Sequence, residues 1–246
     1  MLRVNKFNPA DAVIAVGTGR GFIIQDQAGY RRVVITAAHC LPHLPPAHPA
    51  SYLSERTYEK LLGVVGKTRS VWAECLFADP VADIAVIGSP DNQDLYEQAR
   101  AYDRLIDAAV ALPVAELDAE KMKVGLLLLD GRPVSCIARV IGRGALWIME
   151  GEEKIVGGMS GSPILNQNGA AIGVVVTNQG PHPRLASHLP GWLLGELGLR
   201  SRAVITADER RARRLVRQTL RSRSARPIAL AGRLIGSRSR TQGHQP

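Results

Sequence analysis

The sequence has few cysteines and none of the segments that would place it in a membrane. Its 246 residues include three cysteines, Cys40, Cys75 and Cys136, an odd number without paired spacing. This argues against a disulfide framework, and no C-x-x-C pair exists for a zinc site. The first thirty residues lack a cationic segment followed by an apolar run and a small-residue cleavage site, and no apolar stretch is long enough to cross a bilayer. These absences predict a cytoplasmic protein.

Lysine is absent from the last fifty residues, although the chain as a whole is basic. Residues 197–246 contain thirteen arginines and two acids, Asp208 and Glu209, and therefore carry a formal charge of +11. Since the whole chain carries +9, the first 196 residues carry −2. A segment of this kind favours an anionic partner, such as nucleic acid, acidic lipid or an acidic protein, without sequence specificity.

Short strand patterns run through most of the first 180 residues. They are β-branched, apolar and separated by Gly, Asp or Asn turns, which is typical of antiparallel strands. The predicted strands cover residues 12–16, 22–25, 33–37, 71–76, 84–87, 124–129, 135–141, 146–149 and 171–176. Residues 17–21 (G-T-G-R-G) are interpreted as a hairpin turn, because no helix pattern follows as a phosphate-binding loop would require.

Two segments are predicted to be helical. Apolar residues recur at helical spacing between residues 95 and 109, which suits a connector over residues 90–112. Residues 206–209 (T-A-D-E) form a capping-box sequence, so an Arg-rich helix is expected to extend to about residue 220. From about residue 221 apolar content thins, and a mobile tail is expected.

Three local features suggest hydrolytic chemistry. His39 ends an apolar strand, Asp83 directly precedes another, and Ser160 lies among glycines that permit a tight backbone with amides aimed at one point. Each signal alone has a plain structural interpretation: a packed histidine, a turn aspartate and a hairpin serine. Their joint occurrence in one order is far more specific.

The three motifs resemble those of the trypsin-like (chymotrypsin-fold) serine peptidase family. They read T-A-A-H-C at 36–40, D-I-A at 83–85 and G-M-S-G-S-P at 158–163, and the key positions are separated by 44 and 77 positions. The resemblance implies an all-β peptidase domain over residues 1–196. It would contain two antiparallel six-stranded barrels at about 10–90 and 113–185, joined by the helical connector and followed by the Arg-rich segment 197–246.

The resemblance also implies roles for the matching residues. Ser160 would be the nucleophile, His39 its base, and Asp83 the group that orients the imidazole. The backbone amides of Gly158 and Ser160 would form the oxyanion hole. The expected activity is that of a serine endopeptidase acting on a peptide or protein, with neither a metal nor a cofactor.

Two departures from the secreted members of this family affect the expectations. Met159 replaces the aspartate that precedes their nucleophile, so their zymogen switch should be absent, and G-M-S-G-S-P instead resembles bacterial or viral intracellular branches. Lys154 is the candidate substrate-pocket residue, six positions before Ser160. A lysine there would repel basic side chains, so trypsin-like specificity is not expected.

Two alternatives stay open on the sequence alone. The chain could be a catalytically silent binding or scaffold module with this fold, because an intact triad in sequence does not prove an assembled one. Its main role could also be to bind an anionic surface through the Arg-rich segment.

Overall fold

Two closed antiparallel β-barrels make up most of the structure, a computed structural model that describes residues 8–26, 31–46, 53–142, 144–149, 155–176 and 185–198. The first barrel has the strand order β1-β2-β3-β6-β5-β4. Its strands are β1 (Val13–Val16), β2 (Gly19–Gln25), β3 (Arg32–Thr36), β4 (Thr57–Gly63), β5 (Val71–Asp79) and β6 (Ile84–Gly88). The hairpin predicted at residues 17–21 is tighter than expected: only Gly17 and Thr18 form the turn, and Val16 pairs with Gly19.

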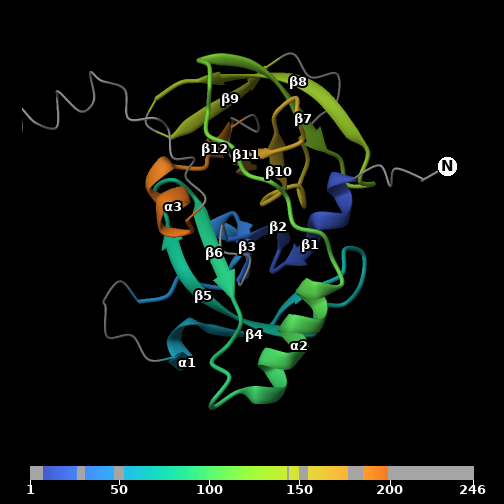
Figure 1. The fold of residues 1–246 in the computed structure, drawn as a ribbon, viewed down its shortest axis with the longest axis vertical. Helices are drawn as coiled ribbons and strands as arrows, with labels where there is room; N and C mark the ends of the chain where they lie inside the picture. Colours follow the sequence, from blue (N-terminus) through green and yellow to red (C-terminus); the bar gives the residue numbers. More distant parts are fainter. Residues whose placement is uncertain are drawn as a thin grey trace, which may run out of the picture. The chain divides into compact units, whose positions relative to one another are not determined.

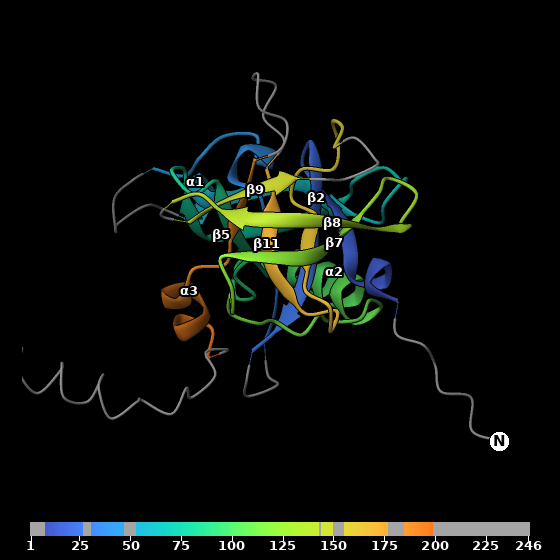
Figure 2. The ribbon, with the colours of Figure 1, turned by 90° about the horizontal axis from the view of Figure 1, so that it is seen from above.

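The second barrel repeats this architecture, with the order β10-β11-β12-β9-β8-β7. Its strands are β7 (Lys121–Leu127), β8 (Pro133–Val140), β9 (Ala145–Met149), β10 (Pro163–Leu165), β11 (Ala171–Val175) and β12 (Leu185–His188). Figure 1 shows it above the first barrel, and Figure 2 views it from above, with β7, β8 and β9 nearest the reader. The prediction of two six-stranded barrels is therefore confirmed.

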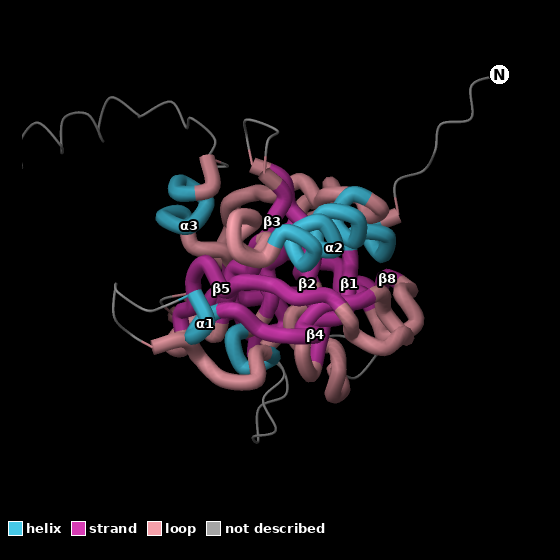
Figure 3. The backbone as a smooth tube through the Cα atoms, turned by 90° about the horizontal axis from the view of Figure 1, so that it is seen from below, coloured by secondary structure: helices cyan, strands magenta, loops and turns pink. Residues whose placement is uncertain are grey.

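Helices are few and short. They are the 3-10 turns η1 (Pro9–Ala12) and η2 (Ala38–Cys40) and the helices α1 (Leu53–Arg56), α2 (Tyr96–Asp107) and α3 (Gly191–Glu196). Helix α2 confirms the predicted connector helix and lies against the first barrel (Figure 3). The buried Tyr102 hydroxyl donates to the carbonyl of Arg32 at 3.1 Å, which ties this helix to β3. No helix in the described ranges is long and apolar enough to span a bilayer.

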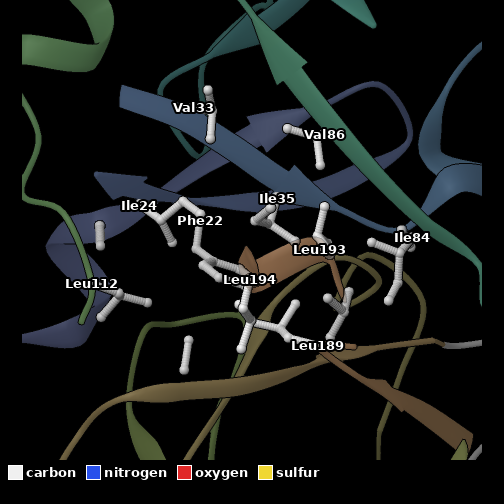
Figure 4. Close-up of a cluster of buried hydrophobic side chains, with 14 of the residues drawn as sticks. Phe22, Ile24, Val33, Ile35, Ile84, Val86, Leu112, Leu189, Leu193 and Leu194 are labelled. Atoms are coloured by element: carbon white, nitrogen blue, oxygen red, sulfur yellow. The ribbon is translucent and has the colours of Figure 1, made fainter. Parts of the chain in front are cut away.

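A shared apolar core joins the two barrels. Strands β2, β3 and β6 bury both faces: Ile23, Val34 and Ile87 point into the first barrel, whereas their neighbours in sequence face the second. The interface cluster drawn in Figure 4 includes Phe22, Ile24, Val33, Ile35, Ile84, Val86, Leu112, Leu189, Leu193 and Leu194. Burial on both faces explains why these strands read as continuous apolar runs instead of alternating ones.

Candidate active site

His39 lies where the first barrel turns away from its own sheet. Strand β3 ends at Thr36, and the chain continues through the single turn η2, which carries His39 between the buried Ala38 and Cys40. The two buried neighbours anchor the turn in the core. The His39 side chain remains 40% exposed, so it is accessible from solvent.

Asp83 holds the imidazole through two bonds from one carboxylate. The His39 backbone N–H donates to Oδ1 at 2.8 Å, and the ring Nδ1 lies 2.6 Å from Oδ2. Because an ionised carboxylate only accepts hydrogen bonds, Nδ1 carries the proton and Nε2 keeps a free lone pair. The hydrogen bond with Asp83 raises the pKa of His39, against the opposing effect of burial, and the Asp83 charge adds to the increase.

The backbone of Asp83 is as unusual as its side chain. Its φ of +53° lies in the left-handed region, which aspartate adopts more readily than most residues. The carbonyl of Asp83 accepts the N–H of Ala38 at 3.2 Å, so main chain and side chain both contact the histidine turn. Asp79 has a different function, because its Oδ1 accepts the N–H groups of Val81 and Ala82 at 2.9 and 3.0 Å. Of these two carboxylates, Asp83 is the one bonded to His39.

The loop around Ser160 is bonded to the first barrel. The carbonyl of Ser160 accepts the N–H of Arg20 in β2 at 2.8 Å. A Cβ at Gly19 would lie 2.6 Å from that carbonyl oxygen and 2.7 Å from the Sγ of Cys40. The backbone of Ser160 and the residue after His39 therefore approach β2 at the same glycine. This brings the second-barrel serine loop to the turn that carries the histidine.

Glycines on either side of Ser160 have conformations that other residues would not accept. Gly161 has φ +81°, and a Cβ there would lie 1.8 Å from the carbonyl oxygen of Arg20. Gly158 has φ +86° and is the third residue of a turn closed by the Met159 N–H to the Val156 carbonyl at 3.2 Å. A turn in which the third residue has positive φ and the second does not is a type II turn. The central peptide is thus turned about 180° from its type I orientation.

Cysteine chemistry does not compete with the serine in the described residues. Cys40, Cys75 and Cys136 are free and buried. Burial raises the pKa of each thiol to about 11, so almost none is thiolate at neutral pH. The prediction that Cys40 is a buried thiol is confirmed.

Two residues that the sequence interpretation missed form side-chain hydrogen bonds between the two barrels close to the site. Ser187 in β12 donates its hydroxyl proton to the carbonyl of Ala82, directly before Asp83. Arg20 is only 6% exposed, and its guanidinium donates to the carbonyls of Leu128 and Leu129. Neither residue carried a signal in the sequence, since Arg20 lies within the segment interpreted as a hairpin turn and Ser187 within a short strand that was not predicted.

Other predictions fall outside the described residues. They concern Lys154 as a pocket residue and the helix and tail expected beyond residue 205. Both stay predictions. Within the described ranges, no group of three or more His, Cys, Asp or Glu side chains could hold a metal ion.

Comparison with known proteins gives structural likeness alone. No protein-family model matches the chain, and no curated protein is significantly similar to it. The MamO protease domain from Magnetospirillum magneticum is 15% identical, with a TM-score of 0.44 over 77% of this chain and 96% of that one. The inactive form of the Rv3671c protease is 19% identical, with a TM-score of 0.46 over 78% and 90%. A human pathogenic astrovirus serine protease is 17% identical, with a TM-score of 0.44 over 75% and 96%. The two six-stranded barrels themselves give the chain a chymotrypsin-like fold.

Proposed function

We propose that this protein is a serine endopeptidase with the triad Ser160, His39 and Asp83. The observation that carries the proposal is the pair between His39 and Asp83, because it leaves Nε2 as the free, basic nitrogen on an exposed ring. Ser160 is proposed as the residue whose hydroxyl proton this nitrogen accepts. The contacts of Arg20 and Gly19 with the Ser160 carbonyl support this, because they bring the serine loop to the first barrel.

The chemistry follows from that arrangement. Nε2 of His39 takes the hydroxyl proton of Ser160 as its oxygen attacks the scissile carbonyl, and the imidazolium is stabilised by Asp83. The same proton passes to the leaving amine when the peptide C–N bond breaks, which leaves an acyl group on Ser160. A water molecule then repeats the two steps, releases the acid and restores the hydroxyl.

The turn before Ser160 is proposed to stabilise the oxyanion. The candidate donors are the backbone amides of Gly158 and Ser160. The type II turn supports this role, since the Gly158 N–H belongs to the central peptide whose direction distinguishes the two turn types. One donor aimed at a developing oxyanion contributes about 3 kcal/mol to transition-state stability.

The enzyme is further proposed to need no amino-terminal activation. Met159 occupies the position before the nucleophile and is only 1% exposed, packed in the interior of the second barrel. An apolar side chain there cannot form an ion pair with a newly cleaved terminus. The motif G-M-S-G-S-P is also proposed to group the chain with the bacterial or viral intracellular branches of the peptidases, which it resembles.

Fluorophosphonate labelling tests the proposal directly. The wild-type chain should be labelled on Ser160 and should cleave casein, whereas Ser160→Ala should lose both properties. Ser162→Ala is the matched control, because Ser162 lies in the same motif but its buried hydroxyl has no hydrogen-bond partner in the described structure. Absence of labelling in a folded wild-type chain would favour a silent binding module with this fold.

A further inference from the structure

An apolar side chain stands exposed beside the proposed oxyanion turn. Leu129, in the hairpin turn between β7 and β8, is 47% exposed. Its Cδ2 lies 3.5 Å from where a Cβ on Gly158 would be. A substrate whose carbonyl points at Gly158 would therefore lie next to this leucine.

The turn that carries Leu129 is held by many bonds. The Leu128 N–H donates to the Arg132 carbonyl, and the Gly131 N–H donates to the Leu128 carbonyl, both at 3.0 Å. From the other barrel, the buried guanidinium of Arg20 donates to the Leu128 and Leu129 carbonyls at 2.8 and 2.5 Å. A planar guanidinium suits two neighbouring acceptors, and its burial makes loss of either bond costly. The exposed leucine is thus presented on a rigid support.

The position of this turn identifies which part of a substrate it would meet. His39 gives its proton to the leaving amine, so the residues after the scissile bond lie toward the histidine and β2. Arg20 joins β2 to both the Ser160 carbonyl and the Leu129 turn, and Gly19 beside it contacts Cys40. The turn is therefore on the leaving-group side of Ser160.

We propose that residues 128–131, held by Arg20, form the subsite for the residue that follows the scissile bond, and that Leu129 makes this subsite select apolar side chains. The inference rests on the proposed function, since it assigns substrate selectivity to that same site. Arg20 acts as a positioning residue, because its buried side chain bonds to the carbonyls of the turn.

Acyl transfer measures this subsite separately from the rest of the substrate. An activated ester forms the acyl-enzyme, and an added amino-acid amide then attacks the acyl carbonyl in place of water, which expels Ser160 and forms a peptide bond. The ratio of transfer to leucinamide over glycinamide should be roughly tenfold in the wild-type enzyme, the size of an apolar contact in such a pocket. Because it is a ratio, it does not depend on the rate of acylation.

Leu129→Ser should reduce the ratio to about one or two, and Leu129→Glu should shift the preference to argininamide. The matched control is Leu76→Ser, a leucine of β5 that is 53% exposed and packs on Gly88, which should keep the wild-type ratio. Arg20→Lys keeps the charge but loses the planar guanidinium, so the ratio should fall in part. Arg20→Met loses both and should lower the ratio further. An unchanged ratio in Leu129→Ser would overturn the subsite while leaving the proposed function intact. A folded wild-type chain without ester turnover would overturn both.

Discussion

At the scale of single residues, the proposed triad leads to a defined pattern of losses. Ser160→Ala and His39→Ala should each lower kcat by about 10⁴ to 10⁶, and the double variant should be little worse, because the groups act as a unit. The measurement is hydrolysis of an activated ester and of casein, with circular dichroism to verify folding. Wild-type hydrolysis by Ser160→Ala would contradict the assignment.

The aspartate variants separate two neighbouring carboxylates. Asp83→Asn should keep the fold, because asparagine also tolerates positive φ, but its amide would face Nδ1 and favour the wrong tautomer, lowering kcat roughly 10⁴-fold. Asp79→Asn is the control, since the asparagine carbonyl can still accept from Val81 and Ala82. A larger loss for Asp79→Asn than for Asp83→Asn would refute the proposed role of Asp83.

The pH dependence follows from the raised pKa of His39. The base must be neutral, so kcat/KM should rise with pH through a midpoint above the ordinary value of 6.5. Asp83→Asn removes the hydrogen bond and the charge that raise the pKa of His39, so the midpoint should move down.

The contribution of His39 to folding stability has the opposite pH dependence to kcat/KM. The folded state favours protonated His39, so this contribution is complete below the ordinary pKa and is lost as pH rises through the folded pKa.

Kinetic and thermal titrations of the same variants check both trends. The pair Ser160→Ala and Ser160→Ala/His39→Gln isolates the contribution of His39 to stability without turnover. Their difference in Tm should shrink as pH rises from 5 to 9, which spans the ordinary pKa of about 6.5 and the region above it. A difference that grows over this range would show that His39 is held in its neutral form.

At the scale of elements, the turn before Ser160 provides a test of the oxyanion hole. Gly158→Ala has room for its methyl group, whose nearest neighbour would be Leu129 at 3.5 Å, but φ +86° disfavours alanine. The variant should therefore shift toward a type I turn and lose one donor, lowering kcat about 10²- to 10³-fold with a smaller change in KM.

The control for this variant is another glycine with the same backbone strain. Gly169, in the turn between β10 and β11, has φ +77° and no atom near a Cβ position. Gly169→Ala should have a similar cost in free energy of unfolding, on the order of 1 kcal/mol, without loss of kcat. Equal losses of kcat in both variants would mean that Gly158 matters through stability alone.

The elements also show where local patterns were insufficient. The sequence interpretation found nine strands and missed β4, β10 and β12. Strand β4 contains charged, exposed Glu59 and Lys60, and Lys60 has φ +51° at an irregularity in its pairing with β5. Strand β10 has three residues and begins with proline, and β12 has four. Short or interrupted strands carry too little periodicity, and their pairing partners stabilise them instead.

At the scale of the whole molecule, the close approach of the Ser160 loop to β2 of the other barrel depends on Gly161. A methyl group at Gly161 would overlap the carbonyl oxygen of Arg20, only 1.8 Å away. Gly161→Ala should therefore lower the free energy of unfolding by about 3 kcal/mol or more and abolish turnover, because either the serine loop or β2 must move. Urea unfolding and ester hydrolysis measure the two effects.

Gly66→Ala is the matched control at this scale. Gly66 has φ +80° but no neighbour within reach of a Cβ, so it carries the strain without the clash. The Gly66→Ala variant should lose on the order of 1 kcal/mol in free energy of unfolding and retain full turnover. If Gly161→Ala were no worse, the close approach between the barrels would not be needed for the site.

The sequence by itself predicted the class of fold and identified the candidate catalytic residues. His39, Asp83 and Ser160 could be named because each lies in a local motif, and motifs depend on residue type and short-range backbone needs such as glycines at positive φ. The short β-branched segments likewise predict antiparallel strands, because residue type and turn residues act over a few positions, whereas the two barrels were expected from the family resemblance.

Only the tertiary structure decided which distant groups meet. That Asp83 bonds to the histidine while Asp79 closes a turn follows from the packing of η2 against the loop before β6. That Arg20 reaches across 109 residues to the Leu129 carbonyl follows from the docking of two barrels through a shared core. Such contacts leave no local pattern in either segment, since their geometry is fixed by side-chain packing over the whole interface and not by the neighbours of each residue in the chain.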